Sequence, residues 1–118
     1  MATIEEIAAA ALQRDSLQLR HLTQEYLRSA PTLADTPRPQ TTDEYILSMS
    51  AALLELFAMR TNQRPPPWSA DVGPMKEPFF LLKSAVHMKR LRELCRTESP
   101  EPLRSRRFYA PPDYLTFA

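Results

Sequence analysis

The stretch Thr41–Arg60, TTDEYILSMSAALLELFAMR, decides the expected fold because, wound as a helix, it is apolar around most of its circumference. Only Glu44, Ser48 and Glu55 form a coherent polar strip along it. Other elements must cover such a helix on most sides, so we expect it to be the buried centre of the protein. The capping-box spacing of Thr41 and Glu44 predicts where it begins. The alternative interpretation is a helix that docks into a partner.

The N-terminal segment predicts two further helices. Thr3 and Glu6 have capping-box spacing in front of an apolar stripe, and Asp15 and Gln18 repeat that spacing. The second spacing favours a new helix there, whereas the lack of glycine or proline favours one bent helix over residues 4–28. We expect two helices.

Two proline-rich segments, residues 29–40 and 62–78, indicate loops between helices. The second contains Trp68, which we expect to anchor the loop in the core. The three prolines Pro65–Pro67 leave open a different interpretation, in which the segment is a polyproline ligand for an aromatic groove.

The C-terminal half is less regular. Residues 79–86, FFLLKSAV, fit either a strand or a buried helix, and a helix is favoured because the apolar pattern continues through residues 87–95. Ser99-Pro100 predicts an N-cap followed by proline at the first position of another short helix. The end of the chain, residues 104–118, is aromatic and apolar and is expected to pack against the body.

The composition narrows the fold class. The chain has 118 residues with one glycine and twelve prolines. A single glycine excludes most phosphate-binding loops, which need several, and argues against a β-sandwich or barrel built on tight hairpins. We therefore predict one all-α domain over residues 1–118, a compact bundle of four to five helices with proline-rich connecting loops.

Charge is unevenly distributed along the chain. Residues 1–60 carry five basic and eight acidic side chains, a net −3, whereas residues 83–107 carry eight basic and three acidic ones, a net +5. This asymmetry indicates an anionic partner for the C-terminal half, or two halves that attract each other. No secretory signal and no apolar run of membrane-spanning length is visible, so we expect a cytoplasmic protein without a membrane partner.

No catalytic pattern stands out. His21 and His87 have no neighbours at metal-ligand spacing, and the pair His21 and Glu25, one helical turn apart, fits an exposed helix face. Cys95 has leucine neighbours and fits a buried, unreactive thiol. We predict a protein that is not an enzyme and uses no cofactor or metal.

The basic C-terminal half supplies the candidate contact residues. Basic side chains next to aromatic ones can bind phosphates and stack on bases, but three acids dilute the charge, and a solvated helix face explains it as well. The candidates for contacts with a partner or a nucleic acid are Lys89, Arg92, Arg96, Arg104, Arg106, Arg107 and Tyr109.

One run of residues resembles a known group of proteins. Trp68, Glu77–Leu82 (EPFFLL), Glu98–Arg104 (ESPEPLR) and Phe108–Pro111 (FYAP) are similar to segments of short uncharacterised bacterial proteins associated with nucleotidyltransferase-type toxin loci. The resemblance covers about the C-terminal half and implies an antitoxin-like or accessory role. No motif tied to a particular chemistry lies within it.

Two functions from different classes follow. The first is a non-enzymatic, intracellular protein-interaction module, antitoxin-like or an adaptor, that binds a protein partner or a second copy of itself. The alternative is a small nucleic-acid-binding protein that uses residues 83–107.

Overall fold

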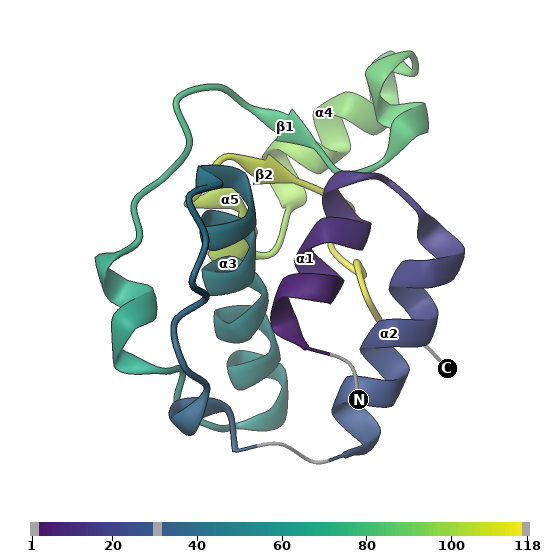
Figure 1. The fold of residues 1–118 in the computed structure, drawn as a ribbon. Helices are drawn as coiled ribbons and strands as arrows, with labels where there is room; N and C mark the ends of the chain where they lie inside the picture. Colours follow the sequence, from purple (N-terminus) through teal and green to yellow (C-terminus); the bar gives the residue numbers. More distant parts are fainter. Residues whose placement is uncertain (1–2, 30–31, 117–118) are drawn as a thin grey trace.

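The computed structural model describes residues 3–29 and 32–116, which form a mostly helical protein with one small pair of strands (Figure 1). The elements, in chain order, are α1 (Ile4–Leu12), α2 (Ser16–Arg28), η1 (Leu33–Asp35), α3 (Glu44–Thr61), η2 (Pro67–Asp71), β1 (Phe79–Phe80), η3 (Lys83–Val86), α4 (Lys89–Glu98), α5 (Glu101–Arg104) and β2 (Phe108–Tyr109), where η marks a 3-10 helix. The predicted all-α fold class is confirmed.

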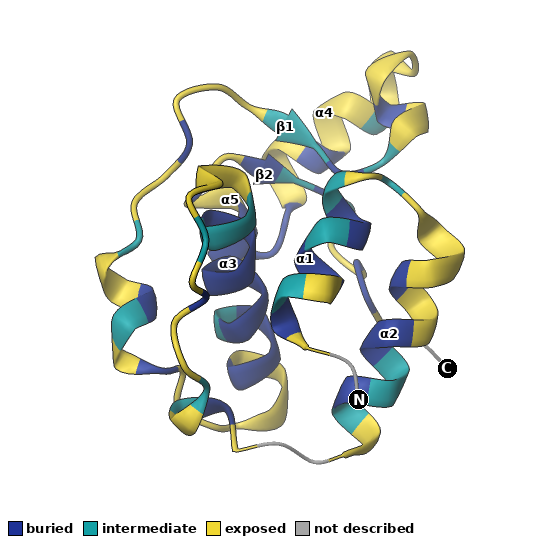
Figure 2. Ribbon diagram, viewed as in Figure 1, coloured by how far each residue is buried: buried dark blue, intermediate teal, exposed yellow. Residues whose placement is uncertain are grey.

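Helix α3 is the buried centre that the sequence predicts. Its middle residues have no exposed surface or almost none, and Figure 2 shows the helix dark blue along most of its length. The polar strip is covered in part: Glu44 is exposed and Glu55 half-buried, but Ser48 is buried and its hydroxyl donates to the Gly73 carbonyl over 3.3 Å. The predicted start was wrong by two residues: Asp43, and not Thr41, caps the helix by accepting from the backbone N–H groups of Tyr45 and Ile46.

The N-terminal segment forms two helices, as predicted, and both caps are present. Thr3 and Glu6 make a capping box, and Asp15 accepts from the Gln18 N–H over 3.1 Å. Helix α1 packs between α2 and α3 (Figure 1). It ends in a Schellman turn in which Asp15 N–H donates to the Ala10 carbonyl and Arg14 has a left-handed backbone with φ 57°.

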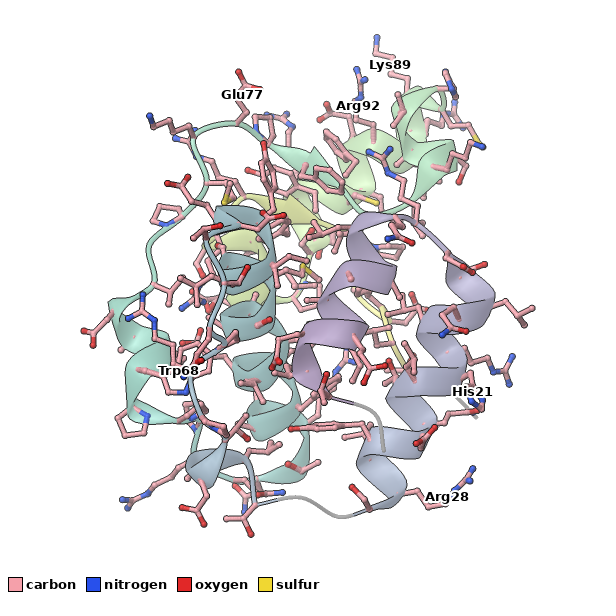
Figure 3. All side chains as sticks on the ribbon, viewed as in Figure 1. His21, Arg28, Trp68, Glu77, Lys89 and Arg92 are labelled. Carbon is pink, nitrogen blue, oxygen red and sulfur yellow. The ribbon has the colours of Figure 1, made fainter. Side chains whose placement is uncertain are left out.

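The loop after α3 begins at Asn62, which ends the helix in the left-handed conformation with φ 56°. Trp68 is half-buried on the core, and its indole N–H donates to the Thr36 carbonyl over 2.8 Å (Figure 3). The loop is therefore anchored through its tryptophan, as predicted, and the same contact connects it to the other proline-rich segment.

The helix predicted over residues 79–86 is wrong. Phe79 and Phe80 form a strand, β1, that pairs in parallel with Phe108 and Tyr109 of β2, and only the short η3 follows it. The apolar pattern fitted both structures, and hydrogen bonds from a segment almost thirty residues away decided between them. β1 and β2, of two residues each, form the one sheet in the part of the chain that the structure describes.

The cap predicted for the short helix after α4 is also wrong, although α5 exists. Pro100 is its N-cap, without a side-chain hydrogen bond, and Ser99 has another role. The Ser99 hydroxyl accepts from the Ala110 N–H over 2.8 Å and donates to the Cys95 carbonyl. Ser99 therefore ties the end of α4 to the C-terminal segment.

The C-terminal segment packs on the body, as predicted, through the buried side chains of Tyr114 and Leu115. Arg60, from the last turn of α3, donates to the Tyr114 carbonyl over 2.5 Å. Residues 117–118, included in the same prediction, lie outside the described residues. In the part of the chain that the structure describes, no helix is both long and apolar enough to cross a bilayer.

Candidate functional site

Most of the candidate contact residues lie on or beside a projection formed by residues 82–98, which we call the arm. It contains η3 and α4 and extends from the edge of the helical body (Figure 1). The backbone N–H groups of His87 and Met88 both donate to the Ser84 carbonyl, over 3.2 and 3.0 Å, and this turn sets α4 against η3. Of the arm residues, Ala85 and Cys95 are buried, and neither belongs to the main core cluster.

Both ends of the arm are fixed to consecutive residues of the body. At its start, the Leu81 N–H donates to the Tyr109 carbonyl over 2.9 Å. At its end, the Ala110 N–H donates to the Ser99 hydroxyl over 2.8 Å. The arm is therefore an excursion that leaves and returns at the same place, next to strand β2.

Three candidate cations lie on α4 at three- and four-residue steps. Lys89 extends from the outer edge of the arm, and Arg92 lies closer to β1 (Figure 3). Arg96 forms an ion pair with Glu93 at 2.8 Å, and this hydrogen bond is the main cause that lowers the pKa of the Glu93 carboxyl. Because both partners are exposed, the pair neutralises charge on the arm more than it stabilises the fold.

Arg92 connects the arm to the aromatic residues of the strand pair. Its guanidinium donates to the Val86 carbonyl over 3.1 Å and lies 5.5 Å from the ring centre of Phe80. Phe80 in turn packs on Tyr109, with ring centres 5.4 Å apart. The structure thus brings Arg92 and Tyr109 together around Phe80, and both rings are half-buried.

Arg104 and Arg107 are exposed but lie outside the arm. Arg104 donates to the Thr97 carbonyl over 3.0 Å, and Arg107 donates to the Lys76 carbonyl over 2.5 Å. Arg107 also has a left-handed backbone, with φ 66°. Arg104 is thus bonded to the last turn of α4, and Arg107 to the loop before β1.

The prediction that Arg106 contacts a partner or nucleic acid was wrong. Its side chain is 7% exposed and forms an ion pair with Glu55 of α3. Two parallel hydrogen bonds of 2.5 and 3.0 Å join the guanidinium to the carboxylate, and a third of 2.7 Å reaches the Ser69 carbonyl. Arg106 therefore holds α3, η2 and the C-terminal segment together.

Sequence reasoning missed the exposed apolar residues of the arm. Val86, Met88 and Leu94 are 38%, 57% and 43% exposed, although Leu94 has the helical spacing of a core residue. The available signal was the composition of α4, where charged residues outnumber apolar ones and leave a narrow apolar stripe. Figure 2 shows the arm mostly yellow.

Cys95 is the buried side chain of α4, and burial raises the pKa of its thiol. A thiol that is covered and protonated is a poor nucleophile, so slow labelling under native conditions is expected. His21 and Glu25 lie 3.6 Å apart on the exposed face of α2, the arrangement their spacing predicts. Residues 3–29 and 32–116 contain no cluster of three or more histidine, cysteine or acidic side chains suited to a metal ion.

Comparison with known proteins adds no relative: no family model, no curated protein and no solved structure matches this chain.

Proposed function

We propose that this chain is a non-enzymatic protein-interaction module and that its arm binds an acidic protein partner. The observation that carries the proposal is the exposure of α4. Of the ten residues of this helix, Cys95 is the one that is buried. A helix that shows so much surface contributes little to the core, and an interaction is a physical reason to keep it.

The surface of the arm has the two components that such binding needs. Met88 and Leu94 supply apolar side chains that a partner's groove can cover, the usual anchors when a helix docks. Residues 82–98 carry five basic and two acidic side chains, which favours an acidic surface around that groove and speeds association with it. An antitoxin-like or adaptor role in the cytoplasm is one form of this function.

The fixed base of the arm supports the same function. Since both of its ends are hydrogen-bonded beside β2, the arm is presented in one orientation before a partner arrives. A preformed surface loses less conformational entropy on binding than a flexible segment does.

The test is affinity purification of the tagged full-length chain from its source cells, beside two variants. The double variant Met88→Ser/Leu94→Ser should lose a stoichiometric partner that the wild type retains. Leu17→Ser is the control, because Leu17 is an apolar side chain 81% exposed on α2, a helix that is not part of the arm. Equal recovery with the double variant, or loss with Leu17→Ser, would contradict the proposal.

A second copy of the chain is the other protein that the arm could bind. Light scattering coupled to size-exclusion chromatography tests for such a dimer. If the wild type has the mass of a dimer and Met88→Ser/Leu94→Ser has the mass of a monomer, the arm is a self-association surface. Thermal melts of all variants establish that they remain folded.

Nucleic-acid binding is the second candidate function, and one observation favours it. Arg92, Phe80 and Tyr109 form a cationic and aromatic group beside the exposed Lys89 and Arg96. Such groups can stack bases and bind phosphates. The neutralising pair of Arg96 with Glu93 and the burial of Arg106 weaken the positive field, so we rank this function second.

A further inference from the structure

A cavity of about 580 Å³ lies at the base of the arm, between the turn from α1 to α2, η3 and the C-terminal segment. Its volume is within the range of small-molecule sites. Leu19, Leu81, Leu115 and Tyr114 supply most of its apolar wall. None of the lining residues belongs to the exposed apolar surface of the arm.

The charged residues of the cavity all have the same sign. Arg14 and Lys83 line it beside the imidazole of His87, and no aspartate or glutamate is among the lining residues. Arg14 and Lys83 come from different segments of the chain, the α1–α2 turn and η3. An anion in the cavity would therefore meet cations from two segments and no repelling carboxylate.

Arg14 is held in place without a counter-ion among residues 3–29 and 32–116. Its Nε–H donates to the Phe80 carbonyl over 2.9 Å, and its guanidinium lies 4.7 Å from the ring centre of Phe79. These contacts use one N–H group and one face, and leave the terminal N–H groups without a carboxylate partner among the described ion pairs. A half-buried, fixed guanidinium of this kind is well suited to bind a carboxylate through two hydrogen bonds.

Backbone strain is located at the same site. Arg14 and Leu115 both have left-handed backbones, with φ 57° and 61°, in a region that a leucine rarely adopts. The two residues line the same cavity from different segments. Strained residues that persist at one place often shape a site.

We propose that this cavity binds a small carboxylate with an aliphatic tail, the chemistry of a medium-chain fatty acid. Arg14 and Lys83 bind the carboxylate, and Leu19, Leu81 and Leu115 cover the tail. Ser16 and Ser84, whose hydroxyls make no described hydrogen bond to the protein, complete the polar rim. The proposal is independent of the function proposed for the arm.

Calorimetric titration of the full-length chain with hexanoate, octanoate and octanol tests it. Octanoate should bind at least about tenfold more tightly than octanol, the value of one charge-assisted hydrogen bond. Each added methylene should lower the dissociation constant about fourfold, since burial of a methylene favours binding by a constant amount.

Matched variants separate the charge from the tail. Lys83→Gln should weaken octanoate binding about three- to tenfold and leave octanol binding unchanged. Lys76→Gln removes the same charge outside this cavity and should change neither. Met88→Ser/Leu94→Ser should also leave octanoate binding unchanged, which distinguishes a failure here from a failure of the function proposed for the arm.

Three results would overturn the proposal. They are the absence of saturable octanoate binding at millimolar concentration, equal affinity for octanol and octanoate, and equal effects of Lys83→Gln and Lys76→Gln. Since Lys83 and Lys76 are both exposed, neither substitution should unfold the protein, and a thermal melt checks this.

Discussion

Arg106 and Glu55 form an ion pair that holds together segments distant in the sequence. The pair lies in a mostly covered place, with 7% and 23% of the two side chains exposed, and the guanidinium also bonds to Ser69. One side-chain nitrogen, Nε of Arg106, is buried without a described partner. The arrangement favours one geometry, because only a planar, forked cation meets the carboxylate and the carbonyl together.

Arg106→Met should therefore destabilise the protein strongly, by about 3 kcal/mol, because it leaves the Glu55 carboxylate partly covered and unpaired. Denaturant melts measure the change. Arg104→Met is the matched control, and at that exposed site the free energy of unfolding should stay within about 0.5 kcal/mol of wild type. Glu55→Leu/Arg106→Met, which removes both charges, should be less destabilised than the single variant, and equal losses would contradict the assignment.

Tyr114 carries a buried hydroxyl without a described hydrogen-bond partner, and burial raises its pKa. Because the pKa of Tyr114 is raised in the folded protein, the unfolded chain loses this proton first, at a pH of about 10. The contribution of Tyr114 to the free energy of unfolding is therefore fully present below about pH 10 and is lost as the pH rises further. Tyr114→Phe removes the unpaired hydroxyl. At pH 7 its free energy of unfolding should therefore equal that of wild type or exceed it by up to about 1–3 kcal/mol.

Tyr114→Phe should also lose stability less steeply than wild type between about pH 10 and 11. In this range, each pH unit lowers the free energy of unfolding of wild type by up to about 1.4 kcal/mol through the buried tyrosine. Melts at a series of pH values measure this slope. Tyr45→Phe is the matched control, because Tyr45 is 40% exposed. Parallel pH profiles for Tyr114→Phe and wild type would show that the ring is not buried in solution.

Single residues also mark the limit of sequence reasoning about the candidate site. Arg104, Arg106 and Arg107 are near neighbours in one basic run, and only the position of Glu55 on α3 determines which of them turns inward. Leu94 has core spacing yet is 43% exposed, because none of the described elements covers it. Both outcomes depend on tertiary packing, which local spacing does not contain.

At the level of elements, α3 organises the fold. Its buried side chains face α1, η2 and α5, so a change in them is felt by several elements at once. Leu53, with no exposed surface, lies in the middle of the helix.

Leu53→Ala should reduce the free energy of unfolding by about 2–5 kcal/mol, because it removes buried methyl groups and leaves a cavity. Leu17→Ala makes the same chemical change at a site that is 81% exposed, and should cost less than about 0.5 kcal/mol. Urea melts of both variants give the comparison. Similar values for the two would mean that α3 is not the core in solution.

Helices with local signals could be predicted from the sequence, and elements defined by distant contacts could not. The break between α1 and α2 was predictable from Asp15 and Gln18, although Arg14 takes the left-handed position that glycine usually marks. Strand β1 was not, because two phenylalanines in a short apolar run become a strand only when Phe108 and Tyr109 lie beside them.

At the level of the whole molecule, the acidic first half and the basic second half meet directly at Glu55 and Arg106. Arg96 pairs within its own helix instead, and Lys89 extends into solvent. Attraction between the two halves thus explains the buried cation Arg106. It does not explain the exposed cations of the arm, which remain available to contact a partner.

We expect no complex with single-stranded RNA or duplex DNA at physiological salt, because Glu93 and Glu98 interrupt the positive field of α4. Fluorescence polarisation with labelled oligonucleotides measures binding. A micromolar, salt-sensitive complex would contradict this if Arg92→Ala/Arg96→Ala abolished it and Arg28→Ala/Arg38→Ala did not. In that case, removal of one cation that binds a phosphate should reduce the log–log salt slope by about 0.7 to 0.9.

The attachment of the arm at Tyr109 and Ala110 has a consequence for how the protein opens. Since residues 82–98 leave and return at adjacent points and contain no member of the main core cluster, they form a candidate unit of local unfolding. Amide hydrogens of α4 should then exchange with solvent deuterium faster than those of α3, while the helical body stays closed. A short turn that joins Leu81 to Ser99 should leave a body that still folds, so the arm can change in sequence without a change in the rest of the chain.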